Sequence, residues 1–219
     1  MIVNIVACGN SASEWYKTSC DLSIGVNDCE KWGHPVDQLI VINSPRQFTK
    51  ERQDIIKATK AKVFSHSDSW HGILNYERLR LQSFSKHLKK GHVYSSKTSP
   101  FVAMSHAFNQ GATDIILHGV DLVDHPTFHP GNKLHAYELR QIEKFARMLG
   151  EQECRVWLGK DFGALGKFLR VWPWNKETVI DWSGALVNSV SKNKEYVVTV
   201  DRIGLTDDDA KKFIEITKK

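Results

Sequence analysis

Histidine and aspartate side chains that could move protons or bind a metal are concentrated in residues 121–135. The segment contains two aspartates and three histidines, namely Asp121, Asp124, His125, His129 and His135. Imidazole and carboxylate groups are zinc ligands, and imidazole exchanges protons near neutral pH. The spacings match no short zinc motif, so we assign no metal site, and metal binding by His125 and His129 stays open. His135, at the entrance of a predicted helix, is the candidate general base, and Asp121 is the second candidate catalytic residue.

Glycines and small residues with a hydroxyl or amide side chain follow nearly every predicted strand. They are Gly9, Asn10 and Ser13 after the first strand, Asn27 after the second, Thr98 and Ser99 after the fifth, and Gly119 after the sixth. Such residues let a backbone approach a phosphate and offer it hydrogen-bond donors. A turn or a helix cap explains each residue taken singly. Because ligands bind at the carboxyl ends of parallel strands, the set predicts a nucleotide-binding edge.

Two common phosphate-binding motifs are absent from this edge. The first loop, Gly9-Asn10-Ser11-Ala12-Ser13, has one glycine where the dinucleotide fingerprint G-x-G-x-x-G needs three. No P-loop occurs in the sequence either. The pattern therefore disfavours an NAD-dependent enzyme and a Walker-type nucleotidase.

The elements that must position these residues alternate between strand and helix patterns. Strands are expected at Ile2–Cys8, Leu22–Asn27, Gln38–Asn43, Lys62–Ser65, His92–Ser95, Thr113–His118 and Arg155–Leu158, and helices at Thr49–Ala61, from Thr98 to Gly111, and at Leu134–Leu149. This order predicts an α/β fold: a Rossmann-like, mostly parallel sheet that is flanked by helices.

The composition is that of a globular protein in two parts. The chain has 219 residues, of which 41% are hydrophobic and 25% are charged, and this excludes a largely disordered protein. We expect a Rossmann-like nucleotide-binding domain over residues 1–170. Residues 171–219 change in character and are predicted to form a C-terminal α+β extension that is packed on this domain.

Other sequence features bear on location and redox state. No apolar run approaches the roughly 18 residues of a membrane span, and the N-terminus lacks the features of a signal peptide. The four cysteines contain no C-x-x-C motif. We therefore expect no membrane span, a cytoplasmic location and free thiols. The oligomeric state is left open.

The net charge of +5 favours an anionic ligand but does not require nucleic acid. All of this excess lies in residues 1–170. Clusters such as Lys86 to Lys90, and Lys160 with Lys167 and Arg170, are candidates for contact with a polyanionic acceptor. A solvated helix face is the alternative for each of them.

Several motifs together resemble a known family. They are Gly9-Asn10-x-x-Ser13, Val26-Asn27, Thr98-Ser99-Pro100, the run from Ile115 to Asp121, and Asn132-x-x-His135. This set resembles the bacterial sialyltransferases of glycosyltransferase family 42, and also the wider Rossmann-like group that contains archaeal 6-hydroxymethylpterin pyrophosphokinases and small phage proteins. The resemblance covers about residues 1–150 and implies a single-domain GT-A-variant fold.

The resemblance implies roles for particular residues. Asn10, Ser13 and Asn27 would contact the nucleotide of a sugar donor, Thr98, Ser99 and the backbone near Gly119 would line its base or phosphate, and His135 would deprotonate the acceptor hydroxyl. Two features depart from the family. Ser11 and Ala12 replace a Gly-Pro pair, and no tyrosine follows Asp121 before Tyr137.

The leading interpretation is an inverting glycosyltransferase that uses a nucleotide-activated sugar as co-substrate and requires no other cofactor. Its acceptor would be a small molecule, a glycan, or a hydroxymethylated base in phage DNA. One alternative is a Mg²⁺-dependent pyrophosphoryl or nucleotidyl transferase with Asp28, Asp121 and Asp124 as candidate ligands. The other is a non-catalytic nucleotide-binding module.

Overall fold

The computed structural model describes residues 1–84, 87–96, 98–122 and 133–173, with the side chains of the last segment described from Ala136 onward. Within this part, Met1–Trp172 forms one compact unit. The extension predicted for residues 171–219 lies almost wholly outside the described residues. The predicted boundary at residue 170 and the packing of the extension therefore stay predictions.

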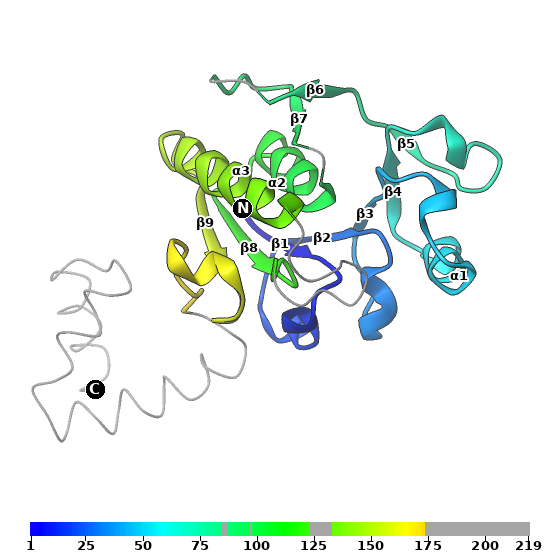
Figure 1. Ribbon diagram of the computed structural model, residues 1–219, viewed down its shortest axis with the longest axis horizontal. Helices are drawn as coiled ribbons and strands as arrows, with labels where there is room; N and C mark the ends of the chain where they lie inside the picture. The colour runs from blue at the N-terminus through cyan, green and yellow to red at the C-terminus, as the bar shows by residue number, and fades with distance from the viewer. Residues whose placement is uncertain (85–86, 97, 123–132, 174–219) are drawn as a thin grey trace, which may run out of the picture. The chain divides into compact units, whose positions relative to one another are not determined.

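Seven parallel strands form the central sheet in the order β5-β4-β3-β2-β1-β8-β9 (Figure 1). The strands are β1 (Ile2–Val6), β2 (Leu22–Val26), β3 (Gln38–Ile40), β4 (Lys62–Ser65), β5 (Glu77–Arg78), β8 (Asp114–His118) and β9 (Arg155–Leu158). The predicted Rossmann-like α/β fold with a parallel sheet is confirmed.

The strand order reverses at β1. Strands β2 to β5 extend the sheet on one side of β1, whereas β8 and β9 extend it on the other. The carboxyl ends of β1 and β8 are therefore the topological switch point of the sheet. Such a switch point is where open α/β sheets bind their ligands.

One predicted strand lies outside the main sheet, to which it was expected to belong. The segment at His92–Ser95 forms β7 (Val93–Ser95), but β7 pairs with β6 (Leu81–Ser83) in a separate two-stranded sheet. The Tyr94 backbone N–H donates to Ser105 Oγ at 2.8 Å. This bond ties β7 to a helix instead of to the edge of the main sheet. The two short strands β5 and β6 were not predicted.

Three helices form at the predicted places: α1 (Lys50–Ala58) and α2 (Ser99–Asn109) lie within the predicted ranges, and α3 (Lys133–Gly150) is one residue longer at each end. Pro100 occupies the first turn of α2, where its missing N–H leaves no intrahelical bond unmade. The buried rings of Phe101 in α2 and Phe145 in α3 stack with their centroids 4.5 Å apart. This contact joins α3 to α2, which itself packs on β1, β2 and β3.

Apolar side chains from alternate strand positions form two buried clusters. Val3 and Ile5 of β1 belong to the cluster that contains α2 and α3, while Val6 belongs to the cluster that contains Ile56 of α1. This alternation is expected of a strand that is covered on both faces. In the part of the chain that the structure describes, no helix has the length and apolar character that crossing a membrane requires.

A polar pair lies within the buried part of the β1–β8 contact. His118 Nε2 lies 3.3 Å from Asn4 Oδ1, and Asn4 Nδ2 donates to Thr18 O at 3.1 Å. Burial lowers the pKa of His118 to about 4, so its ring is neutral. A Cβ at Gly159, which follows β9, would overlap this ring. Gly159 is therefore required by the packing of His118.

We expect Gly159→Ala to destabilise the protein by about 1–3 kcal/mol, because the added methyl group must displace the buried His118 ring. The midpoint of denaturant unfolding measures this loss. Gly150→Ala is the matched control, because a Cβ there meets no atom within 4 Å. Equal midpoints for the two variants would contradict the proposed packing role.

Candidate functional site

The loops that follow β1 and β8 are in direct backbone contact at the switch point. Gly9 N donates to Gly119 O at 2.9 Å. A Cβ at Gly9 would lie 2.5 Å from that same oxygen and 2.5 Å from Asp121 Oδ2. Gly119 has a φ of +71°, in the left-handed region, and its Cβ would lie 2.8 Å from Ala7 O. Both positions therefore need glycine for the two loops to approach this closely.

Asp121 fixes the shape of the loop that follows β1. Its buried carboxylate accepts hydrogen bonds from the backbone N–H of Ser11, at 3.2 Å, and from the Ser11 hydroxyl. The same hydroxyl oxygen accepts from Gly119 N at 3.0 Å. The structure thus gives Asp121 a positioning role. A catalytic role for Asp121 stays a prediction.

The loop held in this way presents Asn10 and Ser13 to solvent beside the switch point. Both residues are exposed, whereas Ala12 between them is fully buried. Ala12 N donates to Gly9 O, and Ser13 N donates to Asn10 O, which closes a single 3₁₀ turn. The two predicted ligand-contacting side chains are therefore accessible on a turn whose backbone is fixed.

A second group of polar side chains gathers where β2 and β3 end. Ser99 Oγ lies 3.3 Å from Asn27 Oδ1 and 3.3 Å from Asn43 Oδ1. The Nδ2 groups of Asn27 and Asn43 make no hydrogen bond to another residue that the structure describes. An amide nitrogen carries two N–H donors. The pair therefore offers unused donors at the first turn of α2, where an anion is favoured by the helix dipole.

Neighbouring contacts hold the two asparagines in place. Asn27 has a φ of +55°, a left-handed conformation that asparagine tolerates, and its N–H donates to Ile40 O at 3.0 Å. The carbonyl oxygen of Asn43 accepts from the buried Trp70 Nε1 at 2.7 Å. Asn43 was on the predicted edge of the sheet, but it was not selected as a site residue.

Glu138 is a buried acid that the sequence analysis missed. Its carboxylate, 1% exposed, accepts from Ser96 Oγ at 3.3 Å and from the Thr98 hydroxyl. Burial raises its pKa to about 7, although the two hydroxyls act to lower it. Its burial could have been predicted from helical spacing, because Glu138 is on the same buried face of α3 as Ile142, Phe145 and Leu149. In the structure the Thr98 hydroxyl therefore donates its hydrogen bond to Glu138.

Asp28 is engaged in a separate buried ion pair. Its Oδ1 lies 2.6 Å from Arg52 Nη2 and 3.5 Å from Cys8 Sγ. Burial acts to raise the pKa of Asp28, but the hydrogen bond and charge of Arg52 outweigh it and hold the pKa below its ordinary value. Burial raises the pKa of Cys8 to about 12, so this residue is a thiol.

The carboxylates proposed as Mg²⁺ ligands have other partners here. Asp28 binds Arg52 and Asp121 binds Ser11, while Asp124 lies outside the described residues together with His125 and His129. Among the residues that the structure does describe, no group of three His, Cys, Asp or Glu side chains is arranged to hold a metal ion.

The structure therefore brings several predicted residues together and leaves one aside. Gly9 and Gly119 meet at the switch point, and Asn27 meets Ser99. His135 is in the first turn of α3, one turn before Glu138, but its side chain lies outside the described residues. Its role as general base stays a prediction, as do the ligand contacts of the other residues.

Comparison with solved structures finds the same fold in the sialyltransferase CstII from Campylobacter jejuni, determined in complex with the substrate analogue CMP-3FNeuAc. The match covers 80% of this chain and 86% of that chain, with a TM-score of 0.50 and 10% sequence identity. No protein-family model and no curated protein sequence matches the chain. The likeness to sialyltransferases noted from the motifs therefore extends to the fold.

The buried carboxyl of Glu138 predicts a specific pH dependence of stability. Because its pKa is raised from 4.5 to about 7 on folding, the folded protein binds this proton more tightly. The free energy of unfolding should then fall as the pH rises from about 4.5 to 7, by roughly 3 kcal/mol for the full shift.

Glu138→Gln should remove this contribution, since the amide stays neutral. The measurement is the unfolding free energy of each protein between pH 4 and 8. Glu143→Gln, on the solvent side of the same helix, should keep the wild-type slope. Parallel curves for wild type and Glu138→Gln would show that Glu138 does not titrate in this range.

Proposed function

We propose that the chain is a glycosyltransferase that moves a sugar from a nucleotide-activated donor to an acceptor hydroxyl. The observation that carries the proposal is the pair of unused amide donors of Asn27 and Asn43 around Ser99, next to the β1–β8 switch point. The proposal is supported by the fold, which is shared with a sialyltransferase that was determined with a CMP-sugar analogue.

The donor would bind along the carboxyl edge of the sheet. Its phosphate would accept hydrogen bonds from the Asn27 and Asn43 amides at the first turn of α2, where partial positive charge accumulates. The exposed Asn10 and Ser13 would contact the nucleotide from the turn after β1. Gly9, Gly119 and Asp121 would hold that turn in position, and Thr98 would act through its contact with Glu138.

In the proposed reaction His135 takes the proton of the acceptor hydroxyl. The acceptor oxygen forms a bond to the anomeric carbon as the bond from that carbon to the donor phosphate breaks. The nucleoside phosphate leaves with the electron pair, and the configuration at the anomeric carbon inverts. Amide and hydroxyl donors near the phosphate would stabilise its developing charge. The acceptor is a small molecule, a glycan, or a hydroxymethylated base in DNA.

The donor class is testable by thermal shift with CMP, CDP, UDP, GDP, ADP and dTDP, with their sugar conjugates and with ATP, each with and without Mg²⁺. We expect one nucleotide to raise the melting temperature without metal, and about 2.7 kcal/mol of added stability at 100 times its Kd. Shifts that need Mg²⁺ and a triphosphate would instead indicate pyrophosphoryl transfer. A bound nucleotide sugar that stays intact with every acceptor would indicate a non-catalytic binding module.

The amide donors are tested with the nucleotide that this panel identifies. Asn43→Asp replaces two N–H donors with a carboxylate that repels phosphate, so the thermal shift should be lost. Gln82→Glu makes the same chemical change on exposed β6 and should keep the shift. An undiminished shift in Asn43→Asp would remove Asn43 from the site.

The general base is tested by turnover. His135→Ala should lower kcat by about 10²–10⁴ and leave nucleotide binding largely unchanged, because a base acts on the acceptor and not on the donor. His71→Ala, at an exposed position, is the matched control and should keep full activity. Wild-type turnover in His135→Ala would overturn the assignment.

A further inference from the structure

Positive charge is concentrated in one stretch of the sequence. Residues 41–100 hold 12 of the 30 Lys and Arg residues but only 4 of the 25 Asp and Glu residues. The rest of the chain holds 18 basic and 21 acidic residues and is net negative. The whole net charge of +5 therefore originates in this stretch.

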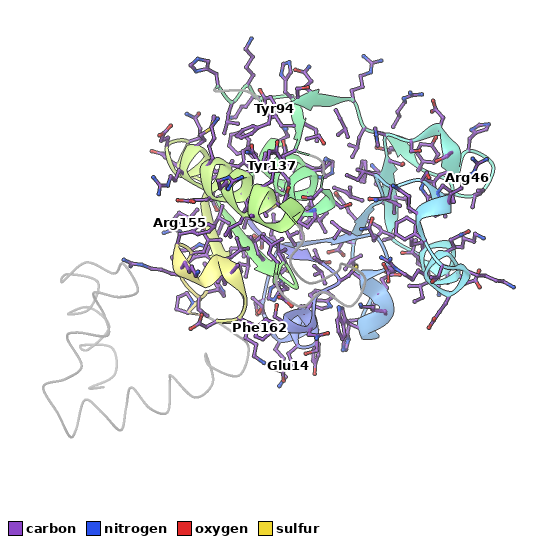
Figure 2. The ribbon with its side chains drawn as sticks, in the orientation of Figure 1. Glu14, Arg46, Tyr94, Tyr137, Arg155 and Phe162 are labelled. Carbon is purple, nitrogen blue, oxygen red and sulfur yellow. The ribbon has the colours of Figure 1, made fainter. Side chains whose placement is uncertain are left out.

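Much of this stretch folds around the β5 edge of the main sheet, and the rest forms the separate sheet of β6 and β7. The stretch forms α1, β4, β5, β6 and β7, which occupy the cyan to green side and upper edge of Figure 1. Figure 2 shows Arg46 pointing outward on this side, opposite to Arg155. We call this surface the basic side. It comprises the exposed residues Arg46, Lys50, Lys57, Lys60 and Arg80, which belong to α1, flank it or follow β5.

The four acidic residues of the stretch offset only part of the charge of the basic side. Glu51 and Asp54 are exposed on α1 and form no ion pair with another residue that the structure describes, and the other two pair with basic residues outside the basic side. Glu77 pairs with Lys62 at 2.8 Å, and Asp68 pairs with Arg78 at 2.7 Å. None of the five residues of the basic side forms an ion pair with another residue that the structure describes. Unbalanced like charges on one surface repel one another, and they attract a polyanion.

The basic side is also hollowed by a groove of about 380 Å³. The groove lies between the end of α1 and the starts of β4 and β5, and its polar lining consists of Lys57, Thr59, Lys62, Asn75, Tyr76 and Glu77. Glu77 is paired with Lys62, so Lys57 supplies the unpaired charge of the groove. Ammonium, hydroxyl and amide groups are the donors that proteins use on phosphodiester oxygens. The groove therefore suits a phosphate backbone.

The extent of the basic side favours a long ligand. Lys62 and Glu77 begin their strands, so the groove is at the amino ends of β4 and β5. Arg46 and Arg80 follow β3 and β5 and lie toward the carboxyl ends. The positive surface thus crosses the sheet from the groove to the edge that carries the candidate site.

The scarcity of exposed aromatic side chains on the basic side indicates which kind of polyanion binds there. The exposed large aromatic residues of the described chain, Tyr16 and Phe162, belong to other segments, and Tyr76 in the groove is half-buried against a core cluster. Single-stranded nucleic acids bind mainly by stacking their bases on aromatic side chains, whereas duplexes are bound through their phosphates. We propose that the basic side binds the phosphate backbone of a duplex nucleic acid. This inference does not depend on the proposed transferase activity.

The proposal is tested by fluorescence anisotropy of a labelled 20-base-pair DNA with the full chain, from 50 to 300 mM NaCl. The triple variant Lys57→Gln, Lys60→Gln, Arg80→Gln should bind at least about tenfold more weakly at 100 mM salt. The slope of log Kd against log salt should fall by about 2–3, roughly one unit for each lost phosphate contact.

The control removes the same charge elsewhere, with Arg140→Gln, Lys144→Gln and Arg147→Gln, all exposed on α3. It should bind within about twofold of wild type. Equal weakening in both triple variants would show that net charge alone attracts DNA, and would overturn the assigned surface. Circular dichroism of each variant establishes that the fold is kept.

Competition with unlabelled ligands distinguishes duplex binding from binding of other polyanions. Unlabelled duplex DNA or duplex RNA should displace the probe more effectively than single-stranded DNA, heparin or vesicles with anionic lipid. Tighter binding of vesicles, heparin or single strands than of either duplex would overturn the proposal, as would absence of duplex binding at 50 mM salt. None of these readouts requires nucleotide-sugar turnover, so failure here is distinct from failure of the proposed enzyme.

Discussion

The backbone contact between Gly9 and Gly119 is the constraint on which the rest of the site depends. It joins the loops after β1 and β8 where the strand order reverses, and it leaves no room for a Cβ at either position. The Ser11 hydroxyl, bonded to Asp121 and Gly119, closes the same contact from the side. Because both loops are fixed to each other, the direction in which Asn10 and Ser13 face is fixed with them.

Most of the fold could be predicted because its strands are buried on both faces and carry continuous apolar runs. The strands at Lys62–Ser65 and Arg155–Leu158 have the predicted bounds. The expected place of β7 in the main sheet was wrong because pairing is a tertiary property: Tyr94 is held by Ser105 of α2, which the local pattern cannot reveal. The short strand β5, with two exposed residues, has no apolar signal.

The sequence predicted several residues of the candidate site, but it did not predict which side chains contact one another. Asn27 and Ser99 were identified from their positions after strands, and they do meet. Asn43 was equally placed, but only the structure shows that it shares Ser99 with Asn27. Glu138 was overlooked because a charged residue in a helix is usually solvated. Its place on the apolar stripe of α3 was visible in the sequence and is the better guide.

The position of β1 has a consequence for how the chain folds. In the register of the sheet Ile2 pairs with Asp114 and Val6 with His118, so the central strand cannot complete its ladder until more than half of the sequence has emerged from a ribosome. Pairings of such high contact order form slowly. Until β8 arrives, one edge of β1 is an open template for wrong partners. Aggregation during synthesis is thus the hazard that this strand order creates, and a chaperone that covers the nascent β1 edge would relieve it.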